Sequence, residues 1–470
     1  MNARPLLRLF SLGLFLVATC FSSNAAAQEA TDPNADLLKL VVELLNDSDK
    51  DMRAVGLEQV RTELKGEAAT KQLLALLPKL NAGAQASLVA ALGDRGDATA
   101  KPELLKMIRD ESAAEGIRAA AIQAVSALGS EADAELLVGL LAAKSEELSK
   151  TAQTSLAKLP GAGTSKVLAA LMEQQKLPQR IVLMDVLVAR KASDAVPGLL
   201  AAALDENAEL RGAAVKALGQ LASADNLPGL VAAVLKAESG KEREAAEKAV
   251  MFVCQRSGGP DDRCKPLLAA VKQLSDADQL QLLSTVGRVG GKDSLEVIGE
   301  RIASSNPREH ELGIRALCNW PDATVAGQLR ELMAEEDRPE LDAMLLAALI
   351  RIAPLPDQRT PAERLALLEQ VMQLCSKDGE RNQVLKRAPA IRTIETLRFV
   401  IPYLDQPALA AQAQEAVVEL AHHRNLREPN KEEFAKVLDR VQAESKDDIV
   451  RDRAQRYKNG QTWDRKSVGR

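Results

Sequence analysis

A helical hairpin of about 31 residues recurs along this chain, and it limits the possible folds more than any other feature of the sequence. Residues 205–236 and residues 110–141 share one pattern, which is a polar turn, a helix, a short loop and a second helix. One position of the first helix, called the register position below, can be followed from unit to unit. It falls on Arg53, Gln85, Arg118, Ser149, Arg180, Arg211, Arg243, Leu280, His310 and Asp342.

Both helices of each unit carry an apolar face. The residues seven and ten places after the register position are mostly apolar, as Leu218 and Leu221 are after Arg211, and this spacing defines one side of a helix. The second helix has its own stripe, for example Leu227 and Leu230. A single hairpin cannot bury two such faces, so neighbouring hairpins must stack. The sequence therefore predicts an all-α fold, an α-solenoid that forms a right-handed superhelix of hairpins.

The composition agrees with helices rather than sheets. The chain has 470 residues, of which only six are Phe, two Trp and two Tyr, so its core must be aliphatic. Glycines and prolines mark the expected helix ends: Gly93, Gly129 and Gly219 in or just after first helices, and Pro197 and Pro228 in the opening turn of second helices. Residues 360–363 read as a capping box, and Asn430 with Glu433 is expected to form another.

The first 27 residues have the pattern of a cleaved secretory signal. Arg4 and Arg8 precede an apolar run, and three alanines stand before Gln28. A lipoprotein signal is disfavoured because Thr19 directly precedes Cys20. We therefore predict an exported protein, periplasmic or extracellular. The predicted organisation is a signal peptide at 1–27, a solenoid at 35–353, larger helical hairpins with a C-terminal cap at 354–457, and a disordered tail at 458–470.

The units at 205–236 and 110–141 resemble HEAT repeats of the short, bacterial, phycobilisome-lyase-like type. The resemblance is clear over residues 35–342 and continues more loosely to about residue 445. It implies an elongated, curved body whose second helices form the concave face. It also implies an exported bacterial repeat protein that binds a partner protein, because the motif specifies a fold rather than a reaction.

Charge and hydropathy exclude two classes of partner. The formal net charge of the whole chain is −5, although residues from 377 onward contain 19 basic and 15 acidic side chains. The residues before 377 are therefore the acidic part of the chain. A nucleic-acid-binding protein gains most of its affinity from clustered Lys and Arg, which this acidic part lacks. After the signal, no stretch is long and apolar enough for a membrane helix. We expect no nucleic acid partner, no integral membrane segment and a monomeric protein.

One unit is longer than the others. The step between Arg243 and Leu280 is 37 residues, and it contains a loop that is flanked by Cys254 and Cys264. These cysteines would lie at adjacent ends of antiparallel helices, and an exported location is oxidising, so we predict a Cys254–Cys264 disulfide. Two reduced, partly buried thiols are the alternative. Cys318 and Cys375 lie in different units at apolar positions, where buried free thiols are favoured over a second bridge.

The few histidines do not predict a metal centre. His310-Glu311 resembles the His-Glu dyads of a HEAT-like hydroxylase family that binds two irons, but that pattern needs several dyads and this chain has one. His422 and His423 are adjacent and point about 100° apart on a helix, so they cannot easily bind one ion. No phosphate-binding loop or nucleophile elbow is present. We predict no catalytic residue, no metal and no cofactor.

Two repeated features leave their meaning open. The register arginines could form a ladder for anions, although structural ion pairs with turn carboxylates such as Asp47 and Asp205 are favoured. The alanine-rich second helices suit a partner groove and close helix packing equally well. The resulting expectation is a non-enzymatic protein–protein interaction scaffold in the bacterial cell envelope, which binds its partner along the concave face. The alternative is an accessory or regulatory subunit of an envelope enzyme whose chemistry lies on another chain.

Overall fold

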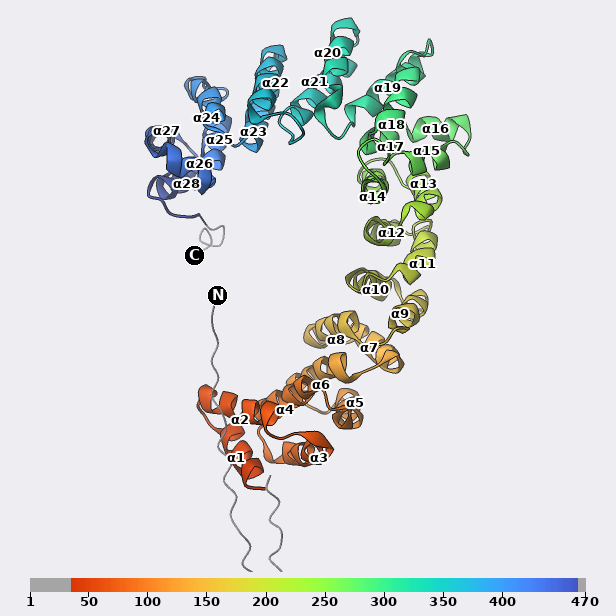
Figure 1. Cartoon of the computed structure of the whole chain (residues 1–470), viewed down its shortest axis with the longest axis vertical. Coiled ribbons are helices and arrows are strands. Elements are labelled where there is room, and N and C mark those ends of the chain that lie inside the picture. Colours follow the sequence, from red (N-terminus) through yellow and green to blue (C-terminus); the bar gives the residue numbers. More distant parts are fainter. Residues whose placement is uncertain (1–34, 464–470) are drawn as a thin grey trace, which may run out of the picture. The chain divides into compact units, whose positions relative to one another are not determined.

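The computed structural model describes residues 35–463, and all the regular elements in this range are helices (Figure 1). The predicted all-α solenoid is confirmed. The described residues form two compact units, unit 1 with residues 35–130 and 144–155 and unit 2 with residues 131–143 and 156–463. The predicted signal peptide lies outside the described residues, and the predicted boundary after residue 353 stays a prediction.

In unit 1 the α-helices are α1 (Ala35–Asn46), α2 (Lys50–Thr62), α3 (Gly66–Leu76), α4 (Ala82–Arg95), α5 (Lys101–Arg109) and α6 (Glu115–Leu128). Helix α8 (Glu146–Lys158) begins in unit 1 and ends in unit 2. Unit 2 contains α7 (Ala134–Gly139), α9 (Thr164–Glu173), α10 (Leu177–Ala189), α11 (Val196–Ala202), α12 (Ala208–Leu221), α13 (Leu227–Lys236), α14 (Lys241–Ser257), α15 (Lys265–Val271), α16 (Asp276–Gln281), α17 (Leu283–Val289), α18 (Lys292–Ile302), α19 (Pro307–Cys318), α20 (Ala326–Glu335), α21 (Pro339–Ile352), α22 (Pro361–Leu374), α23 (Asp378–Arg387), α24 (Ile394–Val400), α25 (Ala410–His422), α26 (Arg424–Arg427), α27 (Lys431–Glu444) and α28 (Asp448–Lys458).

Within unit 2, the first helices of successive hairpins pack directly on one another. The series runs through α10, α12, α14, α17, α19, α21, α23, α25 and α28 (Figure 1). The residues seven places after the register position, such as Leu187, Leu218 and Val250, have no exposed surface. Their burial confirms the apolar stripe, which supplies the continuous aliphatic core that one hairpin could not form alone. Among residues 35–463, none of the helices has the length and apolar character required to cross a membrane.

Two of the glycines that were expected to end first helices instead lie inside them. Helix α4 continues past Gly93, and α12 continues past Gly219. A Cβ atom on Gly93 would lie 2.7 Å from Cα of Ala124 in the next first helix, and one on Gly219 would lie 3.3 Å from Cβ of Ala249. These glycines are therefore needed for close approach of neighbouring helices rather than for a helix stop, and that part of the prediction was wrong.

One of the two expected capping boxes is present. Thr360 Oγ1 accepts a hydrogen bond from the backbone N–H of Glu363, whose carboxylate accepts one from the backbone N–H of Thr360. Asn430 does not cap α27, because the preceding 3-10 turn runs directly into this helix. The Asn430 side chain donates to the Leu426 carbonyl instead. Glu433 pairs with a neighbouring helix instead, so the second box was wrong.

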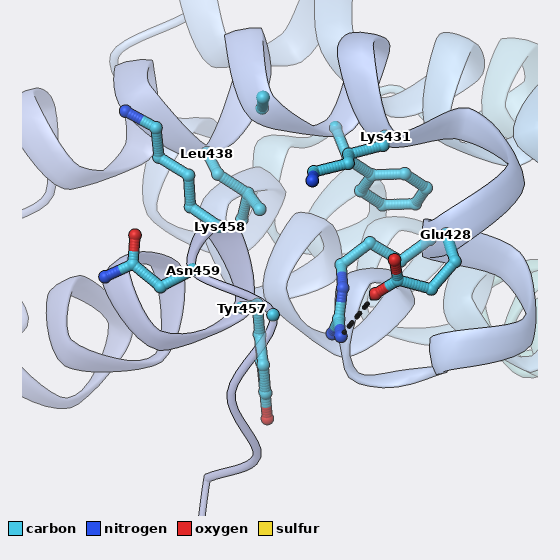
Figure 2. Close-up of a pocket in the computed structure, with 10 residues that line it drawn as sticks. Glu428, Lys431, Leu438, Tyr457, Lys458 and Asn459 are labelled. Carbon is cyan, nitrogen blue, oxygen red and sulfur yellow. Dashed lines mark hydrogen bonds and ion pairs between the residues drawn. The ribbon is translucent and has the colours of Figure 1, made fainter.

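The C-terminal end of unit 2 is closed by aromatic and cationic side chains. Tyr457 and Phe434 are 2% and 1% exposed. The guanidinium groups of Arg427 and Arg453 lie 5.5 Å and 5.7 Å from the centroid of the Tyr457 ring, and Trp463 lies against Arg453. Figure 2 shows Tyr457, Glu428 and Lys431 around the small cavity at this end. These cation–π contacts complete the packing around Tyr457.

Candidate functional site

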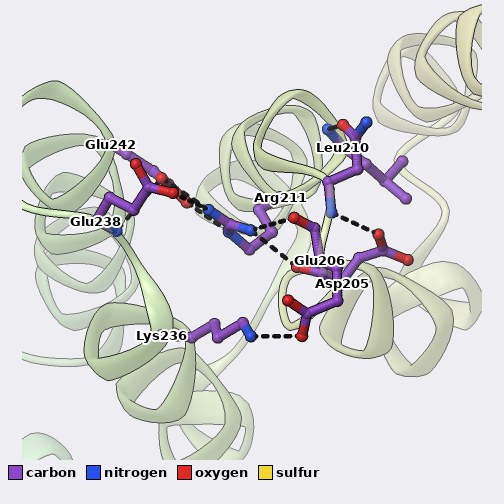
Figure 3. A network of polar contacts seen from close by, with 8 residues as sticks. Asp205, Glu206, Leu210, Arg211, Lys236, Glu238 and Glu242 are labelled. Atoms are coloured by element: carbon purple, nitrogen blue, oxygen red, sulfur yellow. Dashed lines mark hydrogen bonds and ion pairs between the residues drawn. The ribbon is translucent and has the colours of Figure 1, made fainter.

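Two register arginines, Arg53 and Arg211, bind the backbone of the turn before their own helix. Arg211 Nη1 donates to the backbone carbonyls of Asp205 at 3.0 Å and Glu206 at 2.9 Å, while Nε donates to the Glu242 carboxylate at 2.6 Å (Figure 3). Arg53 donates in the same way to the carbonyl of Asp47, at 2.7 Å. These carbonyls lie in the turn before the first helix, where backbone acceptors have no helical partner. The donors of Arg53 and Arg211 are thus used for structure, which disfavours an anion ladder at these positions.

Two arginines beyond Asp342, the last register position found in the sequence, make the same hydrogen bond to a backbone carbonyl. Arg381 donates to the carbonyl of Cys375 at 3.1 Å, and Arg451 donates to that of Ser445 at 3.2 Å. In both cases the acceptor lies six residues before the arginine, as for Arg211. The sequence had favoured turn carboxylates as the partners of the register arginines. The acceptors that Arg53, Arg211, Arg381 and Arg451 share are backbone carbonyls instead.

A second set of arginines was missed by the sequence analysis. Each lies near the C-terminal end of a first helix and donates to carbonyls at the end of the preceding first helix. The pairs are Arg95 with Val60 (2.8 Å), Arg190 with Leu156 and Leu159 (both 2.8 Å), Arg256 with Gly219 (2.7 Å), and Arg351 with Cys318 (2.9 Å) and Trp320 (2.6 Å). Burial lowers the pKa of Arg190 and Arg351. Two of these arginines could have been noticed in the sequence, because Arg95 and Arg190 each stand ten residues after a register position.

His310 is partly exposed and contacts two neighbours. Its Nδ1 lies 2.5 Å from the Ile302 carbonyl oxygen, and its Nε2 lies 3.4 Å from a carboxylate oxygen of Glu336. His422 Nδ1 lies 3.0 Å from the hydroxyl of Tyr457, so it belongs to the C-terminal cap. Among the residues that the structure describes, no group of three or more His, Cys, Asp or Glu side chains could hold a metal ion.

Glu336 gives a pH-dependent test of this part of the fold. Hydrogen bonds from the Arg338 side chain and backbone, with a smaller one from His310, lower the pKa of Glu336 to about 2. Because the pKa is lower in the folded state, this carboxylate stabilises the protein above its usual pKa. The stabilisation is lost as pH falls towards 2. We expect Glu336→Gln to lower the free energy of unfolding by about 2 kcal/mol at pH 7 and by less at pH 3. Urea unfolding at both pH values tests this, and an equal loss at both would contradict it.

The cysteines are buried at the expected helix ends. Cys254 lies near the end of α14, Cys264 precedes α15, and neither has exposed surface. Burial raises the pKa of Cys254 to about 12. All four cysteines in the range 35–463 are thiols, and Cys318 and Cys375 are buried as well. The Cys254–Cys264 disulfide is therefore not present in the structure and stays a prediction for the exported protein.

Differential alkylation tests the bridge. If the protein purified from an oxidising compartment contains it, Cys254 and Cys264 should resist iodoacetamide in denaturant until a reductant is added. Cys318 and Cys375 should react before and after reduction, and they serve as internal controls. Alkylation of Cys254 and Cys264 without reductant, measured by peptide mass spectrometry, would contradict the bridge.

Two open clefts lie between first helices near the end of unit 2. The first, the α21/α23 groove, has a volume of about 320 Å³. It is lined by Ala343, Leu346, Ala347, Ile350, Arg351, Gly379, Glu380, Gln383 and Arg387. Its floor is apolar because α21 presents small and aliphatic side chains towards α23. Of its two arginines, Arg351 is engaged by backbone carbonyls, whereas Arg387 has no hydrogen-bond or ion-pair partner among the described residues.

The second, the C-terminal cleft, lies beside α23, α25 and α28 and has a volume of about 530 Å³. It is lined by Lys386, Pro389, Arg392, Gln412, Glu415, Ala416, Glu419, His423, Asp447, Ile449, Val450 and Arg453. An adjoining cavity of about 450 Å³ shares Arg392 and His423 with it and adds Arg424. The two clefts lie on different sides of α23, because Arg387 faces α21 in the first and Lys386 faces the α25 side in the second.

A further cavity of about 370 Å³ lies against the second helices α18 and α20, with Leu295, Ile302 and Leu332 in its walls. His310 is part of this wall and is already bound to Ile302. The sequence predicted a binding face on the second helices. The α21/α23 groove and the C-terminal cleft lie between first helices, and they contain cations without partners. They are therefore a better candidate site than the cavity at α18 and α20.

The stacked hairpins and the clefts between them define the class of this protein as an α-helical repeat protein. Residues 70–157 and 164–251 match the family model of HEAT repeats. No curated protein sequence matches the chain.

Several solved structures match this chain at low sequence identity. The crystal structure of Kap121p bound to Ste12p matches with a TM-score of 0.45 and 13% identity, over 90% of this chain and 52% of that one. The complex of CpcE and CpcF of phycocyanin lyase from Nostoc sp. PCC7120 matches with a TM-score of 0.25 and 15% identity, over 54% of this chain and all of that one. Human deoxyhypusine hydroxylase matches with a TM-score of 0.24 and 19% identity, over 61% of this chain and 96% of that one. The chain spans about half the length of the karyopherin Kap121p.

Proposed function

We propose that the protein is a non-enzymatic scaffold that binds another protein in the α21/α23 groove and the C-terminal cleft. The observation that carries this proposal is the pair of adjoining open clefts, of about 320 and 530 Å³, on consecutive first helices. Each combines an apolar wall with charged side chains at its edge, which is the arrangement found at protein interfaces. Stacked repeats support such a site because each unit adds rigid surface next to the previous one.

The proposed location is the bacterial cell envelope. The support is the signal-like pattern of residues 1–27 in the sequence. The accessory-subunit alternative shares the same binding site and differs only in what the partner does.

Site-specific photo-crosslinking in intact cells tests the proposal. A photoreactive residue at Gln383, which lines the α21/α23 groove, should attach one defined partner protein. The control position is Glu369 on the second helix α22, which is also exposed but does not line these clefts. A partner recovered from Gln383 and not from Glu369 is the expected result. Equal recovery at both positions, or none at Gln383, would contradict a partner site in the clefts.

A further inference from the structure

We propose that the C-terminal cleft binds an acidic peptide segment of the partner, in which a carboxylate lies against Arg392 and Arg424 and an apolar side chain covers Ile449. This inference rests on the proposed function and adds the chemistry of the partner. It is argued from the charges and the exposed apolar side chain of the cleft.

Three cations of the cleft and its adjoining cavity have unpaired side chains. Lys386, Arg392 and Arg424 are exposed, and none of their side chains has a hydrogen bond or ion pair to another of the described residues. This contrasts with the structural arginines, whose guanidinium groups bind carbonyls or carboxylates in the fold. Cations that the fold does not use remain available to a partner, and charge complementarity of this kind selects partners of opposite sign.

Most carboxylates around the cleft are already engaged. Glu419 accepts an ion pair from Arg453 at 2.7 Å. Asp447 caps α28 by accepting hydrogen bonds from the backbone N–H groups of Ile449 at 2.8 Å and Val450 at 3.1 Å. Glu415 accepts from the side-chain amide of Gln412 at 2.9 Å. The cleft itself is therefore lined by equal numbers of cations and carboxylates, and the positive charge that no carboxylate offsets lies in the adjoining cavity, at Arg392 and Arg424.

The pKa of His423 is lowered in part by the positive charge of the same region. Its pKa is lowered first by burial, then by the charge of Arg392 and by His422, while Glu419 acts in the opposite direction. The cavity that His423 shares with Arg392 and Arg424 has no carboxylate in its lining. An anionic group placed there would meet only neutral and cationic side chains.

The apolar half of the site is Ile449. Its residue surface is 43% exposed, and it lies in the wall of the C-terminal cleft beside Val450. Pro389 and Ala416 extend this wall. An aliphatic side chain left exposed in a cleft indicates a site for an apolar group of a partner. The neighbouring apolar floor of the α21/α23 groove allows a longer segment to continue across α23.

A peptide fits these features better than a nucleic acid. Bases bind single-stranded sites by stacking on aromatic side chains, and none of the residues lining the two clefts is Phe, Tyr or Trp.

Fluorescence anisotropy with the purified protein tests the inference. The probe is a labelled twelve-residue peptide that alternates Asp or Glu with Leu and Phe, and the comparison probes are its Lys and Arg counterpart and a single-stranded oligonucleotide. We expect the acidic peptide to bind and Lys386→Glu with Arg392→Glu to weaken it about tenfold or more. Ile449→Ser alone should weaken it by a smaller factor. The matched control is Lys166→Glu with Lys272→Glu, which makes the same change in net charge at exposed positions away from the cleft.

The outcomes separate the two proposals. Equal weakening by the cleft pair and the control pair, or stronger binding of the basic peptide or the oligonucleotide, would overturn the acidic-peptide inference. A partner crosslinked from Gln383 together with no binding of the acidic peptide would overturn only this inference. Failure of the crosslinking itself would overturn the proposed function. Unchanged circular dichroism and urea midpoints of the variants establish that a loss of binding is not a loss of folding.

Discussion

Replacing Gly287 with alanine should lower the free energy of unfolding of unit 2 by about 3 kcal/mol or more. A Cβ atom on Gly287 in α17 would overlap the carbonyl oxygen of Ala316 in α19 and lie 2.7 Å from the Ala316 carbonyl carbon. Both atoms belong to the backbone, so no side-chain rotation can relieve the overlap. The two helices would have to separate, and the aliphatic contacts between them would be lost.

The matched control for this variant is Gly299→Ala in the adjacent helix α18. A Cβ atom on Gly299 would meet nothing within 4 Å. Alanine is the better helix former, so this variant should be stabilised by about 0.5 to 1 kcal/mol. Urea unfolding followed by circular dichroism measures both. Similar midpoints for Gly287→Ala and Gly299→Ala would contradict the close helix contact.

Replacing Arg211 with methionine should cost about 2 kcal/mol, because it leaves several partly buried acceptors without their donor. The arginine side chain is 5% exposed and pairs with Glu242, whose side chain is 18% exposed. Its Nη1 also supplies the hydrogen bonds to the carbonyls of Asp205 and Glu206. Hydrogen exchange should then become faster in this turn and at the start of α14, where Glu242 lies.

Lys216→Met in the same helix is the control for the loss of one positive charge. Lys216 pairs with Asp185 at 3.1 Å, but its side chain is 67% exposed, so its removal should change the unfolding free energy by less than about 0.5 kcal/mol. Comparable losses for Arg211→Met and Lys216→Met would contradict the structural role of Arg211.

The pH dependence of the Arg211→Met effect separates its two contributions. The hydrogen bond from Arg211 is the main cause that lowers the pKa of Glu242. The ion-pair part of the effect is therefore present above the usual carboxyl pKa and is lost as pH falls through the lower folded value. The part due to the two carbonyls does not titrate and should remain in acid.

The repeat and the identity of its buried residues could be predicted from the sequence, because both follow from local periodicity. Leu187, Leu218 and Val250 occupy equivalent places seven residues after the register position, and each is fully buried. The capping box at Thr360 could be predicted for the same reason, since its two partners lie three residues apart. Periodicity of this kind determines helices and their apolar faces whatever the geometry of the whole.

The contacts between neighbouring hairpins could be found only from the tertiary structure. Gly219 is a packing glycine only because Ala249 of the next unit lies opposite it, and Arg351 is structural only because the carbonyls of Cys318 and Trp320 end the helix beside it. Backbone carbonyls occur at every residue, so the sequence does not mark which of them is an acceptor.

The position of the candidate site was decided in the same way. Lys386 and Arg392 lie far from Ile449 in the sequence, and they come together with it where α23, α25 and α28 pack side by side. The chain by itself therefore determined a row of stacked helical hairpins, because this follows from the spacing of apolar residues. Only the packing of neighbouring helices decided which cations have no partner in the fold.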